Sequence, residues 1–112
     1  MSRRNRPKRL DLSDADQATR DRFAAMLANT HNPDACWTWT GYTDAKDYGQ
    51  FWINGGVQLA HRVAYALNVG PIRAGLTIHH TCYCTSCANP AHLTTASIAA
   101  NTAEGNRRRA AC

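Results

Sequence analysis

The feature that most constrains this chain is the segment of residues 79–93, which reads HHTCYCTSCANPAHL. It holds three of the five histidines and three of the five cysteines of the sequence. Thiolate sulfur and imidazole nitrogen are the ligands that zinc prefers in proteins. The segment has little apolar content with which to build a core, so a bound metal would supply the folding free energy that apolar burial cannot.

The spacing within this segment predicts a closed zinc site. Three of its residues follow one another with four residues between neighbours: Cys82, Cys87 and His92. Structural zinc takes four ligands in a tetrahedron. Cys36 is the expected fourth, because it opens a predicted strand and can fold back onto the segment. Cys84 is a local competitor, and Cys112, at the end of the sequence, ranks last. A closed site has no open coordination position, so this zinc would be structural.

Composition and charge set the class of protein. The 112 residues suit one domain, and the net charge of +5 is concentrated in SRRNRPKR near the start and NRRR near the end. Such clusters attract nucleic-acid phosphates or serve as solvated tails, and charge alone favours neither. We expect a disordered basic tail at 1–10, a domain at 11–106 and a second basic tail at 107–112. The sequence shows no membrane span and no secretory signal, so we expect a cytoplasmic protein in which cysteines bind metal rather than form disulfides.

The hydrophobic pattern predicts an α+β domain of β-hairpins with flanking helices. Helices are expected at 11–30, with Ser13 as N-cap and HNP ending it, at 60–69, and at 96–106, with Thr95 as cap. Strands are expected at 37–42, 48–53, 57–59, 76–80 and 92–95, with a tight turn at Asn54-Gly55. The aromatic residues, including the three tryptophans, are expected to form the core rather than a platform for nucleic-acid bases.

His79 and His80 are adjacent on a predicted strand, so their side chains should point to opposite faces and serve different purposes. Asn101 follows on the predicted C-terminal helix. A helix packed across a two-stranded hairpin can bring the amide oxygen of Asn101 close to a histidine of the first strand.

At these residues the sequence resembles a known family. HHTCYCTSCANPAHLTTASIAAN is similar to the ββα-metal motif of the HNH, or His-Me finger, endonucleases. The spacing of its cysteines and histidines with Asn101 resembles the His-Cys box of zinc-stabilised homing endonucleases. The ordered set CWTWTG, DYGQF, AHRVAY, IHHTC and CANPAHL also resembles small phage and bacterial HNH proteins. The resemblance covers about residues 36–106.

The resemblance implies a metal-dependent DNA endonuclease, either phage-encoded or from a bacterial host, with double-stranded DNA as its substrate. His80 would be the general base that activates water. Asn101 would hold a catalytic divalent metal, Mg²⁺ or Mn²⁺, on the scissile phosphate. Structural zinc would be held by four residues: Cys36, Cys82, Cys87 and His92. Arg62 is either a clamp for the scissile phosphate or an ordinary surface arginine, and His61 is expected to be structural.

One position departs from the pattern of many relatives, which carry aspartate directly before the catalytic histidine. His79 stands there in this chain, as in the nuclease toxins of the wider group. A neutral imidazole weakens affinity for hard Mg²⁺ relative to transition metals. Either His79 ligates the catalytic metal, or Asn101 is its main protein ligand.

Two other functions stay open from the sequence. One is a zinc-stabilised module that binds nucleic acid without cutting it, and the other is a nuclease toxin with an inhibitor protein. The pair of His80 and Asn101 favours the enzyme, because a binding module needs neither a base nor a second metal ligand. Cleavage of both strands by a single-site enzyme requires a homodimer or two sequential nicks, and the sequence shows no clear dimer element.

Overall fold

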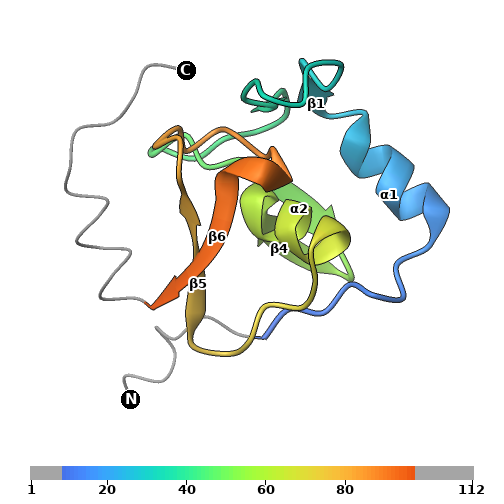
Figure 1. Ribbon diagram of the computed structural model, residues 1–112. Coiled ribbons are helices and arrows are strands. Elements are labelled where there is room, and N and C mark those ends of the chain that lie inside the picture. The colour runs from blue at the N-terminus through green and yellow to red at the C-terminus, as the bar shows by residue number, and fades with distance from the viewer. Residues whose placement is uncertain (1–8, 98–112) are drawn as a thin grey trace.

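The computed structural model describes residues 9–97 and has the predicted α+β architecture (Figure 1). Two α-helices, one short 3-10 helix and six short strands follow one another along the chain: α1 Gln17–Ala24, β1 Leu27–Ala28, β2 Thr38–Trp39, β3 Gln50–Ile53, β4 Gly56–Leu59, α2 Ala60–Asn68, β5 Leu76–His80, η2 Pro90–His92 and β6 Leu93–Ser97. The strands pair as three antiparallel ribbons, β1 with β2, β3 with β4, and β5 with β6. None of the helices between residues 9 and 97 is long and apolar enough to cross a membrane.

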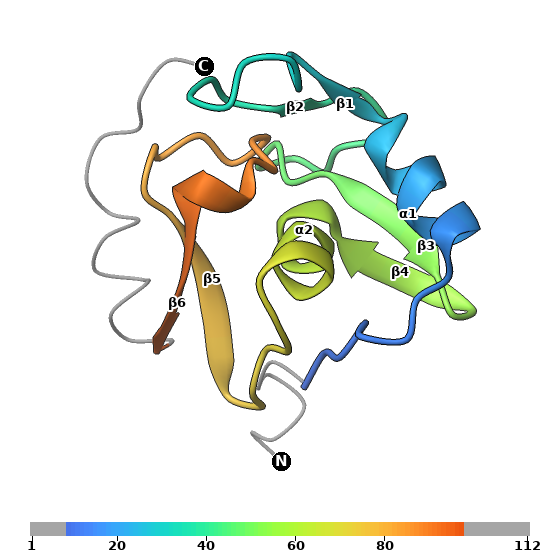
Figure 2. The same cartoon turned by 45° about the vertical axis from the view of Figure 1, so that its right-hand side comes forward.

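Helix α2 lies at the centre of the molecule. It contacts β3 and β4 on one side and β5, β6 and η2 on another, as Figure 2 shows. Val63 and Ala64 are fully buried, and His61 and Arg62 are also buried although they are polar. The helix therefore places two polar side chains in the interior, next to the strands that carry the histidine pair.

The β3–β4 hairpin confirms the turn predicted at Asn54-Gly55. Both residues have positive φ angles, 54° and 78°, which is the backbone of the tight turns that match the twist of paired strands. Trp52 pairs with Val57 across the ribbon. Trp52 is 60% exposed, so the expectation that all three tryptophans are core residues is wrong for this one. Its neighbour Phe51 points inward because side chains alternate along a strand.

The core contains a cluster of three aromatic rings from α1, β2 and β3. The ring of Phe23 lies 5.2 Å from that of Trp39 and 5.1 Å from that of Phe51, the latter edge to face. Gly49 lies against Trp39, and a Cβ at this glycine would come within 2.5 Å of the indole. The close approach of backbone to indole explains why a residue without a side chain stands directly before β3.

The first helix is shorter than the sequence predicted. It begins after Asp16, whose side chain accepts a hydrogen bond from the backbone N–H of Thr19, so Asp16 is the cap rather than Ser13. Both residues are good N-caps, and spacing alone did not separate them. The helix ends at Ala24 rather than near residue 30, because Leu27 and Ala28 pair with β2 instead.

The C-terminal ribbon runs further than predicted. Strand β6 continues to Ser97, and its register pairs Leu76 with Ser97 and Thr95 with Ile78. Thr95 is therefore a strand residue, and the predicted helix cannot start at residue 96. The remainder of the predicted helix, 98–106, lies outside the described residues.

Candidate metal centre and neighbouring histidines

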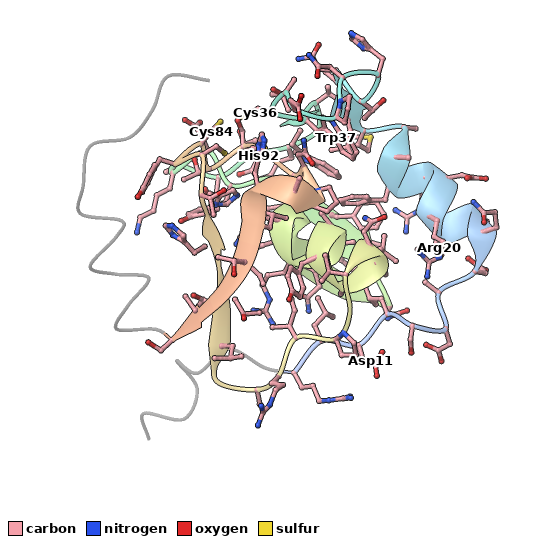
Figure 3. All side chains as sticks on the ribbon, viewed as in Figure 1. Asp11, Arg20, Cys36, Trp37, Cys84 and His92 are labelled. Carbon is pink, nitrogen blue, oxygen red and sulfur yellow. The ribbon has the colours of Figure 1, made fainter. Side chains whose placement is uncertain are left out.

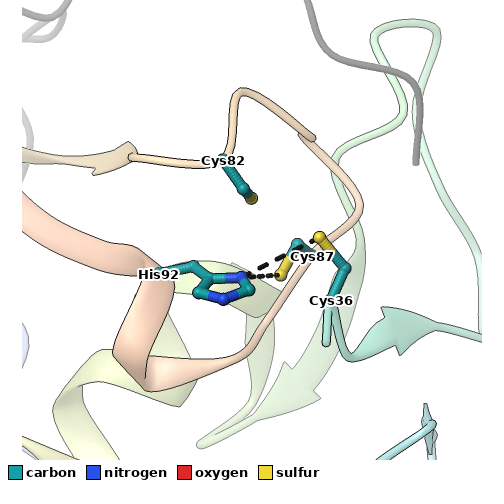
Figure 4. A group of neighbouring side chains, drawn as sticks. All are labelled: Cys36, Cys82, Cys87 and His92. Atoms are coloured by element: carbon teal, nitrogen blue, oxygen red, sulfur yellow. Dashed lines mark hydrogen bonds between the residues drawn. The ribbon is translucent and has the colours of Figure 1, made fainter. Parts of the chain in front are cut away.

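Four side chains from distant parts of the sequence converge at one end of β5, as Figure 4 shows: Cys36, Cys82, Cys87 and His92. Their ligand atoms all lie within 4.8 Å of one another. The Nδ1 atom of His92 is 3.5 Å from the sulfur of Cys87 and 3.8 Å from that of Cys36. Three of them were predicted from their spacing and Cys36 from its place before a strand, and we call the four residues the Cys3His cluster.

The dimensions of the Cys3His cluster suit a zinc ion. Zn–S bonds of about 2.3 Å and Zn–N bonds of about 2.0 Å in a tetrahedron place sulfur and nitrogen about 3.5 Å apart. The two sulfur–nitrogen separations in the cluster, 3.5 and 3.8 Å, are close to that value. Three thiols and one imidazole form a donor set typical of closed structural zinc sites. The cluster can therefore hold a metal such as zinc.

Backbone pairing brings Cys36 to the cluster. The segment that follows Cys36 runs beside the cysteine-rich loop, where the N–H of Trp39 donates to the oxygen of Ser86 at 2.9 Å. In return, the N–H of Ala88 donates to the oxygen of Trp37 at 2.8 Å. The two bonds flank an antiparallel bridge between Thr38 and Cys87. Cys36 and Cys87 are thus held side by side before any metal is considered.

Asn89 joins the same two segments next to the cluster, where its backbone N–H lies 3.5 Å from the sulfur of Cys87. Its side-chain amide is buried and donates to the backbone oxygens of Pro33, at 2.9 Å, and Ala35, at 2.7 Å. Its side-chain oxygen accepts from the N–H of Ala91 at 3.0 Å, which caps the short helix η2. Sequence reasoning missed this role. The available signal was Asn89-Pro90, since asparagine before proline favours a turn or a helix start.

The thiols of Cys82 and Cys87 are joined by a hydrogen bond, which shifts the pKa of each. The pKa of Cys82 is lowered to about 4, chiefly because the Cys87 thiol donates a hydrogen bond to it. The pKa of Cys87 is raised for the same reason, since it is the donor of that bond. Thiolate is the form that binds metal. The lowered pKa of Cys82 favours the form that binds metal, and metal binding would displace the remaining thiol protons.

Cys84, the local competitor for the fourth position, is outside the Cys3His cluster. It is buried, and its sulfur lies 3.4 Å from the hydroxyl oxygen of Ser86. Figure 3 labels Cys36, Cys84 and His92 near the same end of the molecule. Among the described residues, Cys36 rather than Cys84 completes the set of four. Cys112 lies outside the described residues.

His80 is buried at the end of β5, and its imidazole is held by the loop that carries the cluster. The Nε2 atom lies 3.0 Å from the backbone oxygen of Cys87. A carbonyl oxygen only accepts hydrogen bonds, so Nε2 carries the proton and Nδ1 is the basic nitrogen of the neutral ring. Burial lowers the pKa of His80 below its usual value. The ring is consequently neutral near pH 7, as a general base must be.

Two further rings lie against His80, and sequence reasoning did not foresee either contact. The ring centroid of His61, on α2, is 4.7 Å away with an interplanar angle of 38°. Tyr48 lies 5.2 Å from His61 and 6.1 Å from His80. Burial lowers the pKa of His61 well below its usual value, and its Nδ1 atom has no hydrogen-bond partner among residues 9–97. An unpaired buried polar atom costs about 1–3 kcal/mol.

Arg62 and His79 occupy different surroundings. Arg62 is buried and donates from its guanidinium to the backbone oxygen of Leu76 at 3.3 Å, so it is not an ordinary surface arginine. His79 is half-buried on the opposite face of β5 from His80, as the strand alternation predicted. Its ring lies edge to face against Tyr83 at 5.5 Å. Asn101, the expected metal ligand, lies outside the described residues.

Comparisons with known proteins found two relatives. Both are curated proteins of Escherichia phage T7 that are similar to part of this chain. Protein 7.7 is 39% identical over 59 residues, which are 53% of this chain and 45% of the relative. Protein 2.8 is 42% identical over 60 residues, which are 52% of this chain and 40% of the relative. The chain thus spans less than half the length of either relative. No solved structure matches it.

A protein-family model matches residues 58–103. The matched range contains helix α2, strands β5 and β6, His80 and three members of the Cys3His cluster. Cys36 lies before the matched range and reaches the cluster through the pairing of the Trp37–Trp39 segment. The model is that of the HNH endonucleases, and the resemblance seen in the sequence is therefore confirmed over residues 58–103.

Proposed function

We propose that this protein is a metal-dependent endonuclease that hydrolyses phosphodiester bonds of double-stranded DNA. The observation that carries the proposal is the hydrogen bond from Nε2 of His80 to the backbone oxygen of Cys87, 3.0 Å away. It leaves Nδ1 as the basic nitrogen of a buried, neutral imidazole. A buried imidazole that is neutral, with one nitrogen fixed by a carbonyl, suits a general base near neutral pH. The HNH endonuclease match over residues 58–103 supports the same reaction class.

In the proposed reaction, Nδ1 of His80 takes a proton from a water molecule as the water oxygen attacks the phosphorus. The bond between phosphorus and the 3′ oxygen then breaks, and the 3′ oxygen takes up a proton from solvent. The products are a 5′ phosphate and a 3′ hydroxyl. A divalent cation, Mg²⁺ or Mn²⁺, would stabilise the charge on the phosphate and on the leaving oxygen. We assign its binding to Asn101 and His79.

We assign zinc in the Cys3His cluster a structural task. Its four protein ligands leave no open position for water. It would fix the loop that contains Cys87 and thereby the carbonyl oxygen that orients His80. Arg62 is proposed as a phosphate contact from the adjacent helix. The basic segments of the chain, with a net charge of +5 overall, would add affinity for the DNA backbone that does not depend on sequence.

The test is cleavage of supercoiled plasmid by the purified zinc-loaded chain in the presence of Mg²⁺ or Mn²⁺. We expect nicked or linear product from the parent and at least a 100-fold slower rate from His80→Ala, since general-base catalysis contributes about 10²–10⁴-fold. Zinc content and far-UV circular dichroism of His80→Ala should equal those of the parent. His31→Ala is a matched control because His31 is exposed and lies outside the site.

Two outcomes would refute the proposal. Equal cleavage by the parent and His80→Ala would show that His80 is not the base. Binding of DNA by the folded, zinc-loaded parent without any cleavage would instead identify a nucleic-acid-binding module. A gel-shift measurement on the same samples separates these outcomes from a simple failure to bind.

A further inference from the structure

The imidazole of His61 lies against the proposed base although the proposed reaction gives it no task. Its ring centroid is 4.7 Å from that of His80, with 38° between the planes. The two rings come from different elements, α2 and β5, which contact one another. Both are buried, with 5% and 6% of their surfaces exposed. Their contact is therefore a packed feature of the interior rather than a chance approach of surface side chains.

The hydrogen bond to Cys87 does not by itself fix the plane of the His80 ring. A single bond at Nε2 constrains one edge of the imidazole, and the ring can still turn about the line from Nε2 to the carbonyl oxygen. Turning would swing Nδ1, the basic nitrogen, away from its position. A flat group against the ring face opposes this motion, and His61 is such a group.

His61 influences His80 through ring contact rather than through hydrogen bonding. Its buried Nδ1 atom has no partner, and none of the hydrogen bonds formed within residues 9–97 involves its ring. Tyr48 supports it from the segment before β3, with ring centroids 5.2 Å apart and 30° between planes. Tyr48 itself is held by its N–H, which donates to the side chain of Asp44 at 3.1 Å. Tyr48 also lies 6.1 Å from His80, so the three rings form a cluster in which each contacts the other two.

We infer that His61 is a positioning residue for the endonuclease reaction, holding the plane of the His80 imidazole so that Nδ1 faces the reacting water. The inference rests on the proposed function. It assigns the AHRVAY segment a part in catalysis that is separate from phosphate binding by Arg62. Its physical content is a contact between two rings, so a different aromatic ring at position 61 should serve in its place.

The kinetic test compares His61→Ala, which removes the ring, with His61→Phe, which keeps a flat ring without nitrogens. We expect kcat for plasmid cleavage to fall about 100-fold in His61→Ala with KM for DNA unchanged, because small misplacements of a catalytic group have effects of that size. His61→Phe should restore most of the lost rate. Zinc content of both variants should match the parent. A parent-like rate for His61→Ala, or a His61→Phe as slow as His61→Ala, would overturn the inference.

A second readout does not depend on cleavage. In protein labelled with ¹⁵N at histidine, the parent should show His80 in one fixed tautomer protonated at Nε2, and His61→Phe should keep that signature. An averaged or Nδ1-protonated His80 in the parent would overturn the inference even if the His61→Ala chain does not fold. If the parent cuts no DNA, the proposed function fails; loss of the fixed tautomer in folded His61→Ala but not in His61→Phe would then still support the positioning contact, and an unchanged tautomer in both would overturn it.

Discussion

The Nε2 atom of His80 lies 3.0 Å from the backbone oxygen of Cys87, whose sulfur belongs to the Cys3His cluster. One residue thus offers its side chain to the metal centre and its main chain to the proposed base. Any change that moves the backbone at Cys87 should therefore also move the hydrogen-bonded imidazole of His80. This relationship links the structural and the chemical halves of the site.

Removing zinc from the Cys3His cluster should consequently stop DNA cleavage even when Mg²⁺ is abundant. Structural zinc contributes about 10–16 kcal/mol of apparent binding free energy in small zinc-dependent domains, so its loss should unfold or loosen the loop. We expect a zinc-selective chelator to lower the melting temperature and abolish activity together. Added zinc should restore both. Full activity of a chain shown to contain no zinc would contradict the link.

The identity of the fourth ligand can be checked by comparing Cys36→Ser with Cys84→Ser. Cys36 lies in the Cys3His cluster and Cys84 does not, although Cys84 is closer in sequence to the other ligands. We expect Cys36→Ser to bind zinc much more weakly and Cys84→Ser to retain one zinc per chain. Colorimetric release of zinc from each purified variant measures this. The reverse result would place Cys84 in the metal site.

Stability should fall as the pH is lowered because His61 is buried in its neutral form. Its pKa in the folded protein is well below the value of about 6.5 expected in the unfolded chain. At a pH between the folded and the unfolded pKa of His61, the unfolded state binds more protons than the folded state. The stability that comes from burying a neutral His61 is therefore complete above about pH 6.5, and it is lost as the pH falls towards the folded pKa. Urea midpoints of the parent should therefore drop on acidification.

His61→Phe isolates this effect from the titration of the metal ligands and of His80, which both chains share. The variant should gain stability relative to the parent as the pH falls from about 7.5 to about 5. A constant difference over that range would show that His61 does not titrate between the folded and unfolded states.

Gly49 should tolerate no side chain. An added Cβ would lie 2.5 Å from two atoms of the Trp39 indole and 3.0 Å from the Cβ of Ala60. We expect Gly49→Ala to destabilise the fold by about 1–3 kcal/mol through overpacking. Gly56→Ala is the control, since nothing lies within 4 Å of its added Cβ. Denaturant titration of both variants measures the difference, and equal midpoints would contradict the prediction.

The sequence was most informative where chemistry is local and residue types are specific. The convergence of Cys82, Cys87 and His92 and the turn at Asn54-Gly55 agree with the prediction, because few structures accommodate those patterns. The predicted helix start was wrong where two residues were equally suitable as the N-cap. Ser13 and Asp16 both favour an N-cap, and only the tertiary packing of α1 decides between them. Trp52 could not be placed because β-strand alternation does not say which face is buried.

Contacts between distant segments were the least predictable part of the site. The hydrogen bonds of Asn89 to the chain before Cys36 join positions more than fifty residues apart. The cluster of the Tyr48, His61 and His80 rings likewise draws on three separate segments. None of these residues carries a sequence pattern that names its partner. Their meeting follows from how α2 packs between the two hairpins, which only the folded chain reveals.

The long interval between Cys36 and the other three ligands also governs the order of events during synthesis. Cys36 precedes Cys82 by 46 positions, so it leaves the ribosome long before its partners exist. The backbone hydrogen bonds between the β2 segment and residues 86–88 cannot form until those later residues have been synthesised. A zinc ion held by all four side chains would therefore bind only after His92 has been synthesised, so the proposed metal site would be one of the last parts of the domain to form.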